Sequence, residues 1–271
     1  ANNAGQATND FRAYLQEFDP DWLGNVDSPQ RASGLKKENP EPAGKHLFTA
    51  RFHLAEAQHQ ARRMREVRVN LEDLLQLIKE KNAVAEQAQL IADARWLIVQ
   101  PYRLPNPQSN ELELGIKAAR DFLAKHANDP RSVYGAWWIA KTYQQHGRSD
   151  DAIAAFEDFL AKKGHQLPKG EGLTTPIPGL GGTPAKLQSD WEKDGLFQIA
   201  QIRFGQKKYE EATKAWQSYV NKYPDGPHWA NCQRGIINAQ YQIAMDAVEA
   251  KEYAKGRRLF EAFLAANPLD S

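Results

Sequence analysis

Residues 209–224, YEEATKAWQSYVNKYP, contain a pattern that is repeated in residues 149–164 (SDDAIAAFEDFLAKKG) and 253–268 (YAKGRRLFEAFLAANP). In each copy a small residue is followed four positions later by an aromatic residue, and seven and eight positions later by an aromatic and an aliphatic residue. Each copy ends at a glycine or a proline. Spacings of three, four and seven residues place side chains on one face of a helix. The pattern therefore predicts an amphipathic helix that occurs three times.

A partner helix is expected before each copy. An alanine lies twelve residues before each small residue, and an isoleucine precedes each of these alanines. Small residues let two helix backbones approach closely, and this contact can offset the roughly 0.5–1 kcal/mol that a glycine costs in helix propensity. We therefore expect a hairpin crossing at each pair. The pairs are Ala140 with Ala152, Ala200 with Ala212 and Ala244 with Gly256, and Gly115 marks one further second helix.

Small residues at repeat positions 8 and 20, an aromatic residue at 24 and a helix-ending residue at 32 resemble the tetratricopeptide repeat. The resemblance covers residues 136–164, 192–224 and 238–268, although the second helices are spaced by 37, 60 and 44 residues rather than by the family's 34. It implies an all-α fold, a right-handed solenoid of antiparallel helical hairpins that forms a tetratricopeptide-like superhelix. Such a superhelix holds segments of other proteins in its concave groove.

The chain divides into three parts by composition. Residues 1–45 contain four prolines, so we expect an N-terminal arm that lies on the first hairpin and has a short helix at 10–18. Residues 46–110 are expected to form N-terminal helical hairpins. Residues 111–271 hold the repeats, interrupted at 164–190 by an insertion rich in glycine and proline that should be a surface loop.

Two helices are expected in the part before the repeats. Apolar residues recur three and four apart over 47–81, which indicates one helix, and a second is expected over 84–99 before a proline-rich loop. In the repeats, the extra residues between the last two second helices predict a first helix that begins near Trp229.

Composition and motifs favour a binding protein over an enzyme. The 35 Lys and Arg residues balance the 34 Asp and Glu residues, so no bulk charge favours nucleic acid or anionic lipid, and no apolar run is long enough to span a membrane. The lone Cys232 is expected to be a small, semi-buried thiol inside a helix, and a reactive thiol is the alternative. Metalloprotease, phosphate-loop, nucleophile-elbow and dinucleotide motifs are missing, so we expect no catalytic residues, no metal and no cofactor.

The resemblance also implies which residues line the groove, because repeat positions 2, 5, 6, 9, 12 and 13 of first helices face it. The carboxylate clamp of the chaperone-tail type is missing, since Tyr134, Asp194 and Asn238 stand at position 2. Trp138 of the adjacent pair Trp137-Trp138 is expected to face the groove, and the alternative is that both pack between repeats. The expected binding residues are Tyr134, Trp138, Lys141, Gln145, Gln198, Gln201, Gln242 and Met245.

The basic run Arg62, Arg63, Arg65 and Arg68 has two interpretations. Acidic residues lie close by in the sequence, so a solvated surface is the expected one. The alternative is a docking site for an acidic partner or for nucleic acid.

The function hypothesis is a scaffold for protein segments, cut from a larger bacterial extracytoplasmic protein. The second-helix endings resemble repeats of bacterial envelope proteins, and residues 235–271 resemble the N-terminal helical region of large bacterial alpha-2-macroglobulin-like proteins. A free-standing envelope-assembly lipoprotein and an enzyme with a superhelical scaffold are the alternatives, and a cytoplasmic location is the alternative to a periplasmic or secreted one. Partners would be protein or peptide segments, including other domains of the same polypeptide, with no nucleic acid.

The end of the chain adds one expectation. A solenoid normally covers its last hairpin with a polar capping helix, yet the last second helix ends at Pro268, three residues before Ser271. We expect Ser271 to be a cut end, with self-association through the apolar residues of that helix.

Removal of residues 168–186, with the ends joined, should leave the helical content and the folding intact. Loop length costs little free energy, and this segment has no helix or strand pattern to lose. Circular dichroism and thermal melts of the deletion variant would check this. A variant that does not fold would show that the insertion is an integral part of the repeats.

Overall fold

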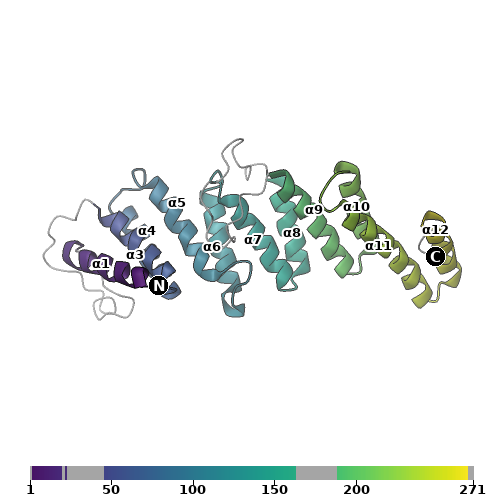
Figure 1. Cartoon of the computed structure of the whole chain (residues 1–271), viewed down its shortest axis with the longest axis horizontal. Coiled ribbons are helices and arrows are strands. Elements are labelled where there is room, and N and C mark those ends of the chain that lie inside the picture. The colour runs from purple at the N-terminus through teal and green to yellow at the C-terminus, as the bar shows by residue number, and fades with distance from the viewer. Residues whose placement is uncertain (1, 20–21, 23–45, 163–187, 268–271) are drawn as a thin grey trace. The chain divides into compact units, whose positions relative to one another are not determined.

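The computed structural model describes residues 2–19, 22, 46–162 and 188–267, in which all regular structure is helical. The chain forms two compact units, unit 1 (residues 1–126) and unit 2 (residues 127–271). In each unit, consecutive helices pack against one another (Figure 1). The expected all-α stack of antiparallel hairpins is confirmed, while the segment 168–186 lies outside the described residues.

Unit 1 contains five α-helices and two short 3-10 helices among its described residues. Helix α1 packs on α3, α3 on α4, α4 on α5 and α5 on α6. The N-terminal helix is longer than the sequence predicted, because it begins at the second residue of the chain. The elements are α1 (Asn2–Phe18), α3 (Leu47–Gln60), α4 (Met64–Glu80), α5 (Ala88–Val99), η1 (Gln100–Tyr102), η2 (Ser109–Glu111) and α6 (Leu112–Lys125).

The prediction of one helix over 47–81 was wrong, because the chain turns at residues 61–63. Arg62 has φ 59°, in the left-handed region. The Arg63 N–H donates to Gln58 O at 2.9 Å, and the Arg62 N–H donates to His59 O at 3.0 Å. These bonds satisfy carbonyls at the end of α3 and stop the helix. The apolar spacing continues through the turn because both helices face the same core.

The same turn ends four other helices. A residue with positive φ follows each helix by two positions, and the next N–H donates to the carbonyl five residues earlier. Glycine is favoured at such a position, but only one of the five residues is glycine. The residues are Arg62, Asn82, Gly147, Lys207 and Lys251.

Helix α1 is attached to α3 by both apolar and charged contacts. Leu15 is fully buried against Leu47 and Leu54. Beyond the end of α1, Asp19 Oδ2 accepts a hydrogen bond of 2.5 Å from Arg51 Nε, and both side chains are buried. A buried ion pair is costly to break because it leaves an unpaired charge behind. The pair therefore fixes where the end of α1 lies on α3.

Gly115 lies at a different kind of contact from the one expected. A Cβ at this residue would lie 2.8 Å from Tyr102 Cβ and 3.1 Å from Leu104 Cδ2. The close neighbours of α6 at this point are therefore η1 and the segment after it, rather than the backbone of a preceding helix. Glycine is needed because the chain after α5 folds back onto α6.

Unit 2 consists of three hairpins among its described residues. Each helix packs on the next, and α11 begins at Trp229 as expected. The helices are α7 (Ser132–Gln145), α8 (Ser149–Ala161), α9 (Gln188–Gly205), α10 (Tyr209–Lys222), α11 (Trp229–Glu249) and α12 (Tyr253–Ala266).

The small residues of each hairpin are buried, as the sequence predicted. The five alanines at the crossings are 0% exposed. At the last crossing, a Cβ on Gly256 would lie 2.7 Å from Val248 Cγ2 and 3.6 Å from Ala244 O. The aromatic residues that follow the crossings are buried in the first two hairpins, as Phe156 and Trp216, and Phe260 is partly exposed in the third.

Replacement of Ala140, Ala200 or Ala244 by leucine should lower the free energy of unfolding by about 1–3 kcal/mol, because three added carbon atoms cannot fit where two helices cross. Thermal and denaturant melts would measure the loss. Ala154→Leu is the matched control, because Ala154 is exposed on α8. Melts of all three variants that match both the wild type and the control would show that the crossings are assigned to the wrong residues.

Candidate binding surface

Polar side chains from two first helices meet on one face of unit 2. Lys141 and Gln144 lie on α7, and Gln198 lies on α9. Gln144 Nε2 donates to Gln198 Oε1 at 2.8 Å, and Lys141 Nζ lies 2.6 Å from Gln144 Oε1 and 3.4 Å from Gln198 Oε1. We call these three side chains the amide bridge. Because Gln144 and Gln198 are 54 positions apart, the bridge shows that α7 and α9 present these positions to the same side.

The ammonium group of the amide bridge is partly withdrawn from water. Burial lowers the pKa of Lys141, and the carboxylate of Asp194 on α9 opposes the shift. The ammonium donates to two neutral amide oxygens in the bridge. An ammonium held in this way can still donate to a carbonyl or an anion that approaches from solvent.

Asp194 and His228 connect the next pair of first helices. His228 immediately precedes α11, and its Nε2 lies 2.5 Å from Asp194 Oδ1. The imidazole also stacks on Phe197 of α9, with the ring centroids 4.3 Å apart and the planes 5° apart. The backbone N–H of His228 donates to the hydroxyl of Tyr219 on α10 at 3.2 Å. One residue thus fixes the start of α11 against both α9 and α10.

The two tryptophans of α7 are both packed. The ring of Trp137 contacts the rings of Phe156 and Trp191, with centroids 5.3 and 4.9 Å apart. Trp138, which was expected to face the groove, is 4% exposed, and so is Tyr134, whose ring meets Trp191 edge to face. Neither Trp138 nor Tyr134 therefore presents an open surface to a partner, and the alternative of two packed tryptophans agrees with the structure.

The other expected groove residues are accessible. Gln145 on α7 and Gln201 on α9 are exposed, while Gln242 and Met245 on α11 are partly exposed. Of the eight residues that the sequence named, the structure brings Lys141 and Gln198 together at 3.4 Å. The binding role of these residues stays a prediction.

Two residues of this surface were not identified from the sequence. Gln144 stands at repeat position 12, which the resemblance marks as groove-lining, so the family pattern could have identified it. His228 lies outside the repeat pattern, and its only sequence signal is its place directly before the lengthened first helix.

Other candidate sites find no support in the part of the chain that the structure describes. No group of three or more His, Cys, Asp and Glu side chains there could hold a metal ion, and no helix there is long and apolar enough to cross a membrane. Cys232 lies in α11 and is fully buried rather than semi-buried, and burial raises the pKa of its thiol to about 12.

The basic run of α4 and the preceding turn belongs to an ion-paired surface. Arg68 Nη1 lies 2.9 Å from Glu111 Oε1, and Arg63 Nη1 lies 3.8 Å from Glu66 Oε1. Glu66 also pairs with Arg12 of α1 at 2.5 Å. These contacts favour the solvated-surface interpretation over a docking site for acidic partners.

Stacked antiparallel hairpins with small residues at their crossings define a helical-repeat protein. The family model for the tetratricopeptide repeat matches residues 134–162, which span most of α7 and all of α8, and residues 194–226, which span most of α9 and all of α10. The matched segments are less than half of the chain. No curated protein matches it, and the resemblance of residues 235–271 to alpha-2-macroglobulin-like proteins has no support.

Several solved structures are similar to the chain, and two of them illustrate the likeness. One is a Podosopora anserina protein described as a kinesin light chain with nearly identical TPR-like repeats, with 14% identity and a TM-score of 0.36 over 83% of this chain and 97% of that one. The other is the MamA protein, with 10% identity and a TM-score of 0.35 over 81% of this chain and 91% of that one.

Replacement of His228 by phenylalanine should lower the free energy of unfolding by about 1–3 kcal/mol, because the aromatic stack can remain while the Asp194 carboxylate loses a hydrogen bond. His228→Ala should cost more, since it also loses the stack on Phe197. Urea denaturation would measure both losses. Equal stability of the wild type and His228→Phe would show that the hydrogen bond contributes nothing to the attachment of α11.

Proposed function

We propose that the protein is an interaction scaffold, and that unit 2 binds a segment of another protein along the face of α7, α9 and α11. The amide bridge is the observation that carries the proposal. It joins side chains of two consecutive first helices, so it marks the side toward which the first helices present their polar positions. The tetratricopeptide matches at the same two hairpins support the proposal, because that family typically binds protein segments.

The accessible residues on this face suit contacts with a peptide backbone. Gln145 and Gln201 are exposed, and each amide group offers both donors and an acceptor. A partner segment in extended form presents unpaired N–H and C=O groups, which such amides can satisfy. The partly exposed Met245 adds an apolar, adaptable contact. The face is therefore better suited to a polar or mixed segment than to a strongly acidic one.

The cellular setting belongs to the same proposal. The second-helix endings resemble repeats of bacterial envelope proteins, which supports an extracytoplasmic bacterial origin, with the chain as a module of a larger polypeptide. The free-standing lipoprotein scaffold is the alternative for the same face. The module of a larger polypeptide and the free-standing scaffold would use the same binding face. One crosslinking experiment therefore tests the face under both hypotheses.

A photo-crosslinking residue placed at Gln145 or Gln201 should capture a partner from an extract of the cells that make the protein. The control is the same residue at Gln217, an exposed glutamine on the second helix α10. Adducts should form from the two first-helix positions and not from Gln217. Equal adducts from all three positions would contradict a binding face on the first helices.

The captured partner then permits a measurement of affinity. The triple variant Gln145→Ala, Gln201→Ala, Gln242→Ala should bind it at least about tenfold more weakly, because several hydrogen bonds are lost while the fold is kept. An unchanged melting temperature would verify the fold. Unchanged affinity would show that binding takes place elsewhere.

A further inference from the structure

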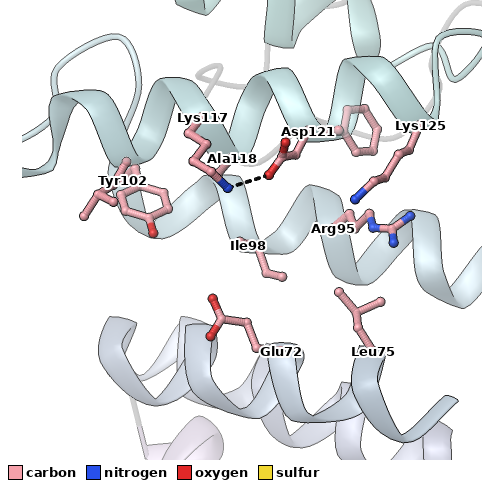
Figure 2. A pocket seen from close by; sticks show the side chains of 11 residues that line it. Glu72, Leu75, Arg95, Ile98, Tyr102, Lys117, Ala118, Asp121 and Lys125 are labelled. Carbon is pink, nitrogen blue, oxygen red and sulfur yellow. Dashed lines mark hydrogen bonds and ion pairs between the residues drawn. The ribbon is translucent and has the colours of Figure 1, made fainter. Parts of the chain in front are cut away.

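A pocket of about 310 Å³ lies within unit 1, between α4, α5 and α6 (Figure 2). It is separate from the amide bridge, which belongs to unit 2, so a role for this pocket does not depend on the proposed function. The size is at the lower end of the range for ligand sites, which suits one large side chain better than a cofactor.

The floor of the pocket is apolar. Leu75 comes from α4, Ile98 from α5 and Phe122 from α6, and Phe122 is fully buried. The ring of Tyr102 closes one end of the pocket, and Figure 2 shows Arg95 and Lys125 at the other end. At the rim, Leu114 is 54% exposed, so the pocket opens to solvent on one side. An open apolar hollow of this kind can take a side chain that projects from a partner.

The charged groups of the rim are unevenly paired. Lys117 forms an ion pair with Asp121, with Nζ and Oδ2 3.0 Å apart. Neither Arg95 nor Lys125 forms an ion pair with a carboxylate among the described residues. Instead, Arg95 Nη1 lies 3.3 Å from His126 Nε2. These two cations stand together at one end of the pocket, and Glu72 is the remaining acidic residue of the lining.

Partial burial makes the Arg95 guanidinium receptive to an anion. Burial lowers its pKa, and the Asp121 carboxylate opposes this shift from beyond ion-pair distance. A guanidinium that has already lost part of its hydration gives up less when it binds a carboxylate, and its planar donors match the two carboxylate oxygens. The charge of the rim and the apolar floor therefore complement a ligand that carries both groups close together.

We propose that this pocket binds an acidic segment of a partner protein in which an aromatic or branched aliphatic side chain lies next to an aspartate or glutamate. The apolar side chain occupies the space over Leu75, Ile98 and Phe122. The neighbouring carboxylate accepts hydrogen bonds from Arg95 and Lys125. The site thus gives unit 1 a specificity for acidic segments that the amide-rich face of unit 2 does not share.

The test uses the full chain, labelled with ¹⁵N, and titrates it with three capped dipeptides. Acetyl-Phe-Glu-amide should shift the amide signals of residues in α4, α5 and α6 at millimolar concentration. Acetyl-Phe-Gln-amide has the same shape without the charge, and acetyl-Ala-Glu-amide has the charge without the ring. Each of these two should bind at least about tenfold more weakly, which corresponds to the loss of roughly 1.4 kcal/mol.

Two variants separate recognition by these cations from general charge attraction. Arg95→Gln and Lys125→Gln should each weaken the binding of acetyl-Phe-Glu-amide several-fold and leave the binding of acetyl-Phe-Gln-amide unchanged. Lys125 is exposed, so its variant should fold normally even if Arg95→Gln does not. Lys79→Gln is the matched control, since Lys79 is an exposed lysine of α4 outside the pocket, and it should bind like the wild type.

Several outcomes would overturn the proposal. Equal affinity for acetyl-Phe-Glu-amide and acetyl-Phe-Gln-amide would show that Arg95 and Lys125 do not recognise the carboxylate. Signal shifts confined to unit 2 would move the site to the other unit, and a lack of any shift at millimolar peptide would remove the site. If Lys125→Gln and Lys79→Gln weaken the binding of acetyl-Phe-Glu-amide equally, the net charge of the protein and not the pocket would account for the binding.

Discussion

The close crossing of two helices at small residues is the contact on which the hairpins of unit 2 depend. The alanines at these crossings are fully buried, and Gly256 has no room for a Cβ beside Val248. A larger residue would separate the two helices of a hairpin, and the next first helix packs on that hairpin in turn. The separation of α7 and α9, which lets Gln144 reach Gln198, therefore depends on how closely α7 packs on α8 at the buried Ala140 and Ala152. Packing in the core of the hairpins therefore determines the geometry of the candidate binding face.

Much of this arrangement could be predicted because its signals are local. The crossing alanines, the aromatic residues after them and the start of α11 at Trp229 all lie at fixed spacings within one or two helices. The turn at Arg62 could not be predicted in the same way. Its apolar spacing continues from α3 into α4, and the residue that takes positive φ is an arginine, so neither periodicity nor a glycine indicates the end of the helix.

The long-range polar contacts could not be predicted from the sequence for a different reason. The sequence indicated that Lys141 and Gln198 line a groove. It did not indicate that Gln144 would form a hydrogen bond with Gln198, which follows the 164–190 insertion in the sequence. The Arg51–Asp19 pair joins residues that lie 32 positions apart, with four prolines between them in the sequence, and no spacing rule connects them. The burial of Trp138 depends on how tightly its surroundings pack, which a repeat position does not specify. The pocket of unit 1 is likewise made by three helices whose charges have no common pattern in the sequence.

The left-handed turns have a consequence for how such a chain changes over evolutionary time. A residue other than glycine in this conformation costs roughly 1–2 kcal/mol, and arginine, asparagine and lysine all occupy it in this chain. The hydrogen bonds of the turn use only backbone atoms, so they are retained whichever side chain is present. Natural selection can therefore exchange residues other than proline, which cannot take positive φ and lacks the N–H, as long as the helices on both sides remain well packed. Related chains could lose every recognisable turn residue and still keep the same connection between helices.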